Sequence, residues 1–221
     1  MAKAPDPRMV KTRLVPPLTI TQAAELYRAL LLDQLDHLAT LPAVDLYVAY
    51  TPAAASALFE GLVPRECRCF PQRSGDLGAR MEHCCAELWR RGHRSAILLG
   101  SDLPPVPAGI IEQACSSLAP AKSRVVLGPS RDGGYYLIGL NQPMPEIFRG
   151  MIWSQPLVLS ETVERLSRLD VEACILPEWF DVDTAEDLDR LHRINEPAVR
   201  AAMARTRAWL DSVNRCASGN S

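Results

Sequence analysis

Five short polar segments carry the side chains of this 221-residue chain that could do chemistry. They are residues 3–14, 75–81, 100–104, 128–136 and 180–184. Each combines charged side chains with glycine, proline or a residue that begins helices, and each adjoins an apolar stretch typical of a strand or helix. The chemistry that such segments could support is phosphate binding by cations and divalent-metal binding by carboxylates.

The first of these segments contains four cations and one carboxylate within eleven residues. Lys11 can contact phosphate oxygens as a point charge, and Arg13 can hold them in a bidentate fork. A solvated N-terminal segment would have the same composition, so the composition supports both interpretations equally.

Carboxylates follow two of the expected strands. Asp102 comes directly after the apolar run 95–99, and Asp181 and Asp183 precede a helix. Such oxygen ligands suit Mg²⁺ or Mn²⁺, and two converging carboxylates need a cation or a proton between them. The structural alternative is that Asp102 is a turn residue and that Asp183 or Thr184 caps the helix.

Two segments combine an aspartate with glycines. Asp76 lies between two glycines ahead of a helix, where small residues let a ligand approach the backbone N–H groups, although a helix cap is the favoured role. The run Asp132-Gly133-Gly134 predicts a hairpin turn, and its glycines would also let a sugar or nucleotide approach the backbone.

The elements that must position these segments alternate along the chain. Apolar periodicity predicts helices over 21–40, 52–59, 77–91, 107–118, 156–169, 184–194 and 197–213, with a capping box at Thr19 and Gln22. It predicts strands over 44–50, 67–70, 95–99, 124–127, 135–140 and 173–176. This alternation indicates an α/β/α sandwich with a mostly parallel sheet, whose ligands bind at the carboxyl ends of the strands.

Composition excludes several classes of protein. The chain is 48% hydrophobic and 23% charged with a net charge of −2, which is ordinary for a globular protein and argues against a nucleic-acid-binding surface. No apolar run is long enough for a membrane span, and no signal peptide is evident, so we expect a cytoplasmic location. Seven cysteines lack the usual spacing of zinc ligands. The length predicts one domain over 1–213 and a frayed tail over 214–221.

The order of the motifs is more specific than any one of them. AKAP…VKTRL, GDLGARM, GSDLP, GPSRDGGYYLIGL, WSQPLVLSET and DVDTAEDL follow one another between residue 2 and about residue 191. This string resembles a bacterial GT-A-type glycosyltransferase family related to nucleotidyltransferases of the molybdenum-cofactor guanylyltransferase kind. The resemblance implies a three-layer nucleotide-diphospho-sugar transferase fold that binds a nucleotide sugar or NTP and an unidentified small-molecule acceptor.

The resemblance also implies roles for individual residues. Those expected to bind the nucleotide are Lys3, Lys11, Arg13, Asp76, Gly78 and Arg80. Those expected to line the donor or acceptor pocket are Gly133, Gly134 and Tyr135. Trp153 is a further candidate for this pocket from its residue type, because an indole can stack on a sugar, although core packing is the favoured role. Asp102 and Asp183 are expected to bind Mg²⁺ or Mn²⁺. Apart from the resemblance, the sequence offers no clear catalytic base, and Asp132 and Asp181 are the candidates.

Two features of the first segment bear on fold and reaction. Met1 stands where proteins of this type end an apolar strand, so the first strand is expected to be missing. The loop 4–10 has no glycine and two prolines, each of which removes a backbone donor that could cradle a triphosphate. This favours glycosyl transfer from a diphosphate donor over nucleotidyl transfer with release of pyrophosphate. A non-catalytic nucleotide-binding module is the third alternative.

Overall fold

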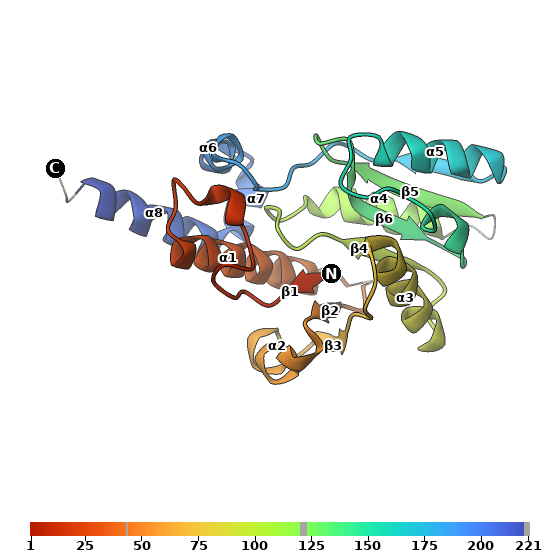
Figure 1. Cartoon of the computed structure of the whole chain (residues 1–221), viewed down its shortest axis with the longest axis horizontal. Helices are drawn as coiled ribbons and strands as arrows, with labels where there is room; N and C mark the ends of the chain where they lie inside the picture. Colours follow the sequence, from red (N-terminus) through yellow and green to blue (C-terminus); the bar gives the residue numbers. More distant parts are fainter. Residues whose placement is uncertain (43, 120–122, 219–221) are drawn as a thin grey trace. The chain divides into compact units, whose positions relative to one another are not determined.

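The computed structural model describes residues 1–42, 44–119 and 123–218, without the side chains of 216–218. Its backbone forms two compact units, each assembled from separate stretches of the chain, and Figure 1 labels their elements. Unit 1 consists of Met1, Gln72–Gly100 and Gly109–Phe180, and unit 2 of Ala2–Pro71, Ser101–Ala108 and the chain from Asp181 onward. The organisation of residues 1–213 as one domain stays a prediction.

Among the described residues, unit 1 is built on a four-stranded sheet in the order β4-β6-β5-β7. Its strands are β4 (Ala96–Leu99), β5 (Arg124–Pro129), β6 (Tyr135–Leu140) and β7 (Glu172–Ile175). β6 runs antiparallel to β4 and β5, whereas β5 runs parallel to β7. The helices that lie wholly or mainly in this unit are α3 (Leu77–Arg90), α4 (Ala108–Leu118), η3 (Pro145–Ile147) and α5 (Val158–Arg168).

The described part of unit 2 contains a parallel three-stranded sheet in the order β1-β2-β3. Its strands are β1 (Ala2–Lys3), β2 (Tyr47–Thr51) and β3 (Arg68–Pro71). Its helices are η1 (Thr12–Leu14), α1 (Ile20–Ala39), η2 (Ala53–Ala55), α2 (Ser56–Leu62), α6 (Ala185–Arg193), α7 (Pro197–Ala202) and α8 (Ala204–Ser218). The first strand, which was expected to be missing, is therefore present as two residues paired with β2. The predicted α/β class is confirmed.

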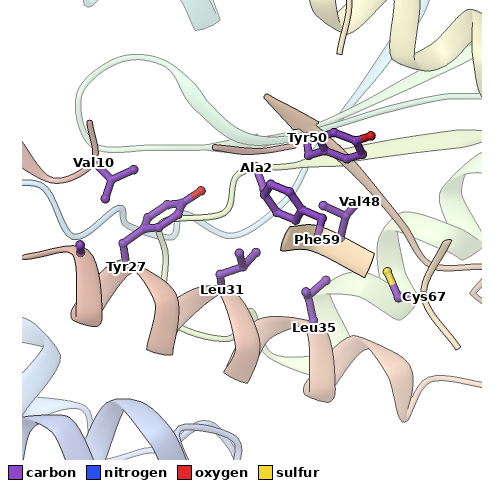
Figure 2. Close-up of a cluster of buried hydrophobic side chains, with 10 residues drawn as sticks. Ala2, Val10, Tyr27, Leu31, Leu35, Val48, Tyr50, Phe59 and Cys67 are labelled. Atoms are coloured by element: carbon purple, nitrogen blue, oxygen red, sulfur yellow. The ribbon is translucent and has the colours of Figure 1, made fainter. Parts of the chain in front are cut away.

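Helix α1 begins where the sequence predicted. Thr19 donates its backbone N–H to the Gln22 side chain and accepts the Gln22 N–H on its hydroxyl, which is the predicted capping box. Tyr27, Leu31 and Leu35 point from α1 into the core of unit 2, where they meet residues of β1 and β2 (Figure 2). Burial of this apolar face supplies most of the free energy that holds α1 in place.

The C-terminal helix of the prediction differs from the structure. Instead of one helix over 197–213, the chain forms α7 and α8 with a break at Met203. The buried carboxylate of Asp33 on α1 accepts the backbone N–H groups of Arg205 and Thr206, in the first turn of α8, at 3.1 and 2.8 Å. An acceptor from another helix caps α8, and α1 and α8 lie side by side (Figure 1).

Two further predictions concern the C-terminus and membranes. The segment 214–221, expected to be frayed, is helical as far as Ser218, and residues 219–221 lie outside the described part. No helix in the described ranges is long and apolar enough to cross a membrane.

Candidate functional site

The ammonium group of Lys11 lies between two of the aspartates that were expected to bind a metal. Lys11 Nζ is 3.1 Å from a carboxylate oxygen of Asp102, 3.1 Å from the Asp102 carbonyl oxygen and 2.9 Å from Asp183 Oδ1. The Lys11 side chain is only 2% exposed, whereas those of Asp102 and Asp183 are 38% and 42% exposed. The three side chains form a cluster in unit 2 whose cation is buried and whose anions face solvent in part.

The backbone of the first loop places Lys11 in this cluster. Lys11 precedes η1 with φ of 50°, and Arg8 earlier in the loop has φ of 75°. The left-handed conformation costs a non-glycine residue about 1 kcal/mol. Two charge-assisted contacts to carboxylates offset such a cost, because each contributes more than a neutral hydrogen bond. The loop is therefore shaped to bring the ammonium inward.

A network anchored on α1 holds the loop that carries Asp102. The Tyr27 hydroxyl bonds to Ser101 Oγ at 2.8 Å and accepts the Lys3 N–H at 2.8 Å. Burial raises the pKa of Tyr27 to about 12, so its phenol stays protonated at neutral pH. One hydroxyl thus links the end of β1 to the residue before Asp102.

Helix α1 also forms hydrogen bonds to this loop at Val106, four residues beyond Asp102. The buried Gln34 accepts the Val106 N–H on Oε1 at 2.9 Å, and His37 Nε2 bonds to the Val106 carbonyl oxygen at 2.9 Å. Asp102 itself accepts the Val182 N–H on its carbonyl oxygen at 3.0 Å, which ties the loop to the segment that carries Asp183. Packing of α1 and backbone pairing therefore fix where both carboxylates lie.

The carboxylate of Asp183 is not needed to begin helix α6. Thr184 is the cap residue, and it forms a capping box with Asp187, whose side chain accepts the backbone N–H groups of Asp183 and Thr184 at 3.2 and 2.9 Å. Of the two candidate caps in the sequence, the structure selects Thr184. The side chain of Asp183 bonds Lys11 instead.

The oxygen atoms around Lys11 Nζ are of the kind that Mg²⁺ and Mn²⁺ prefer. Two carboxylates and one backbone carbonyl surround the Lys11 ammonium, so this group occupies the position that a metal ion would take among these oxygens. In the described part of the chain, no group of three or more His, Cys, Asp or Glu side chains could hold a metal ion. The donor set fits an ion that takes its remaining ligands from a bound diphosphate, and does not fit a closed structural metal site.

Unit 1 contains the predicted nucleotide-binding residues of the second segment. Asp76 caps α3 by accepting the Ala79 N–H at 2.8 Å, which confirms the favoured structural role. A Cβ at Gly78 would lie 2.6 Å from the Phe148 carbonyl oxygen and 2.8 Å from the Trp153 ring. The glycine is thus required by close packing of Trp153. Arg80 Nη1 lies 3.4 Å from the Gln72 side chain.

The Asp132 segment forms the hairpin between β5 and β6. Asp132 Oδ1 accepts the Ser130 hydroxyl and the Gly134 N–H, and Gly133 adopts φ of 84°. A Cβ at Gly133 would lie 1.9 Å from the Pro156 carbonyl oxygen, so the chain itself occupies the space beside that glycine. The adjoining Tyr135 is half-buried, and burial raises the pKa of its phenol. These contacts support the structural role of the turn.

The remaining predicted residues lie in unit 2. Lys3 and Arg13 expose their side chains, and Asp181 is half-buried two residues before Asp183. No role in the site was expected from the sequence for Tyr27 or Gln34. A signal for Gln34 was present, because its spacing places it on one face of helix 21–40 with only apolar or aromatic residues, which are Tyr27, Leu30, Leu31, Leu35 and Leu38.

Comparisons with known proteins agree with this fold. The family described as "uncharacterized protein conserved in bacteria (DUF2064)" matches residues 34–155. The chain is similar to the crystal structure of a "putative nucleotide-diphospho-sugar transferase" from Desulfovibrio desulfuricans G20, with a TM-score of 0.80 and 35% sequence identity. That similarity covers 94% of each chain. No curated protein matches the chain.

Proposed function

We propose that this chain, which belongs to the bacterial family DUF2064, transfers a sugar from a nucleotide-diphosphate donor to a small-molecule acceptor. The observation that carries the proposal is the cluster of Lys11, Asp102 and Asp183, which presents a cation and two partly exposed carboxylates at one place. The 35% identity to a nucleotide-diphospho-sugar transferase-like structure supports the same class of donor. The GT-A assignment and the kinship with molybdenum-cofactor guanylyltransferases stay predictions.

Glycosyl transfer of this kind needs positive charge beside the leaving group, which is the nucleoside diphosphate. The bond between the anomeric carbon and the diphosphate oxygen breaks, the acceptor oxygen bonds to that carbon, and the acceptor proton passes to a base. Asp102 and Asp183 would hold Mg²⁺ or Mn²⁺, which neutralises charge on the departing diphosphate when it is bound. Lys11 would donate to the diphosphate oxygens, and the exposed Lys3 and Arg13 would extend this contact.

The candidate bases differ in whether they lie in the same unit as the proposed metal ligands. Asp132 lies in unit 1, where its Oδ1 accepts two hydrogen bonds within its own hairpin. Asp181 lies in unit 2, two residues from Asp183. We therefore rank Asp181 ahead of Asp132 as the acceptor of the proton.

The proposal is tested by calorimetric titration of nucleoside diphosphates with and without Mn²⁺. We expect the parent protein to bind at least one of them more tightly with Mn²⁺, and Asp102→Ala and Asp183→Ala to lose this metal dependence. Asp189→Ala, which removes an exposed carboxylate from α6 in the same unit, is the matched control and should bind like the parent. Equal metal dependence in all four proteins would refute the assignment of these two aspartates.

Binding of nucleoside triphosphates with release of pyrophosphate would instead support nucleotidyl transfer. Tight nucleotide binding without turnover of any donor would support a non-catalytic module. Each outcome is read from the same protein preparations, so the three functions are separated by one set of titrations and product analyses.

A further inference from the structure

The position of Lys11 bears on how a metal could reach its ligands, and this inference rests on the proposed function. The ammonium is bonded to the same two carboxylates that a divalent ion would use. The two carboxylates carry two negative charges and Lys11 carries one positive charge, so the cluster has a net charge of −1 while Lys11 remains in it. A cation is thus already present without any metal.

A divalent ion and the Lys11 ammonium cannot share these oxygens without cost. Like charges a few ångströms apart repel each other, and the repulsion is stronger where solvent is excluded. The Lys11 side chain is 2% exposed, so water screens it poorly. A metal that arrives alone must displace the ammonium, which would leave a buried positive charge without its partners.

We infer that Lys11 is an internal counter-ion, which a metal ion displaces only when a nucleotide diphosphate arrives with it. The diphosphate offers Lys11 new anionic partners and offers the metal the oxygen ligands that the protein does not supply. The exposed sides of Asp102 and Asp183 leave room for approach from solvent. The substrate of the site is then a metal–nucleotide complex, and metal and nucleotide increase each other's affinity by the same factor.

The test measures Mn²⁺ binding without nucleotide, from the electron paramagnetic resonance signal of free Mn²⁺. Lys11→Met and Lys11→Gln should bind Mn²⁺ about tenfold more tightly than the parent, which is an ordinary magnitude for coupling between sites. Arg8→Met removes an exposed cation from the same loop and should leave the Mn²⁺ affinity unchanged. Adding Asp102→Asn to Lys11→Met should abolish the gain.

Unchanged or weaker Mn²⁺ binding in both Lys11 variants would overturn the inference, and so would an equal gain in Arg8→Met. Thermal unfolding of each variant without metal shows whether the variant is folded. Lys11→Met and Lys11→Gln both remove the ammonium, so an effect of the lost charge should appear in both variants. In the parent, a nucleoside diphosphate should raise the Mn²⁺ affinity, and in Lys11→Met it should raise it less. A parent that binds no nucleotide would refute the proposed function, whereas equal coupling in parent and variant would refute only the role of Lys11.

Discussion

The hydroxyl of Tyr27 provides a sharp test of how the fold positions the candidate site. Tyr27→Phe removes one oxygen atom from a side chain that is 3% exposed and leaves the ring packed on α1. The hydroxyl makes two hydrogen bonds, to the Lys3 N–H and to Ser101 Oγ. Because Ser101 precedes Asp102, loss of these bonds should loosen the carboxylate as well as the core.

The expected magnitude follows from the number of bonds. At about 1 kcal/mol for each, Tyr27→Phe should reduce the free energy of unfolding by about 2 kcal/mol. In a chain of this size that corresponds to a fall of about 4 to 8 °C in the melting temperature. A loosened Asp102 should also weaken Mn²⁺-dependent nucleotide binding about fivefold, which is the equivalent of about 1 kcal/mol.

The matched control is Tyr136→Phe in unit 1. Tyr136 is also 3% exposed, but its hydroxyl donates a single hydrogen bond, to the Pro177 carbonyl oxygen at 3.0 Å. We expect about half the loss of stability and no change in Mn²⁺-dependent nucleotide affinity. Equal nucleotide affinity in both variants and the parent would refute the claim that Tyr27 positions Asp102. Chemical denaturation and calorimetry on the three proteins give both quantities.

Three further predictions concern stability. Asp33→Ala leaves the buried Thr206 N–H without its acceptor, so the free energy of unfolding measured in urea should fall by about 2 to 4 kcal/mol. A loss below about 0.5 kcal/mol would contradict the capping of α8 by Asp33 on α1. Gly133→Ala should lower the free energy of unfolding in urea by about 2 kcal/mol or more, because φ at this position is 84° and the new Cβ would meet the Pro156 carbonyl oxygen. An unchanged free energy of unfolding would contradict this prediction. Burial raises the pKa values of Tyr27 and Tyr136 to about 12, so the unfolded chain loses these phenol protons at a lower pH than the folded chain. The free energy of unfolding should therefore fall as pH rises from about 10 to 12, by up to roughly 2 to 3 kcal/mol for each tyrosine. A free energy of unfolding in urea that does not change over this pH range would refute the prediction.

Local features of this fold were readable from the sequence. The capping box of α1, the Asp76 cap and the hairpin at 128–136 depend on residues close together in the chain, so spacing alone predicts them. The approach of Asp102 and Asp183 was also expected, because both segments follow strands. These features need only local propensity and the rule that strand ends carry ligands.

Contacts that span the chain were not readable. Lys11 was expected to contact phosphates, but it bonds to Asp102 and Asp183, which are 91 and 172 positions away in the chain. Its position depends on a left-handed backbone conformation that no sequence motif predicts. The break at Met203 was missed for a similar reason, since its cap comes from Asp33 on another helix. The ammonium of Lys11 lies between the two carboxylates, and the binding of Mg²⁺ or Mn²⁺ there stays a prediction.

The measurement that tests the proposed function most directly is the identity of the released product. The protein is incubated with Mn²⁺ and a panel of nucleotide sugars or, separately, nucleoside triphosphates, with candidate acceptors, and the products are separated by anion-exchange chromatography. We predict release of a nucleoside diphosphate from a nucleotide sugar, and its loss in Asp102→Ala. Pyrophosphate formed from a triphosphate, with no nucleoside diphosphate from any nucleotide sugar, would contradict the account.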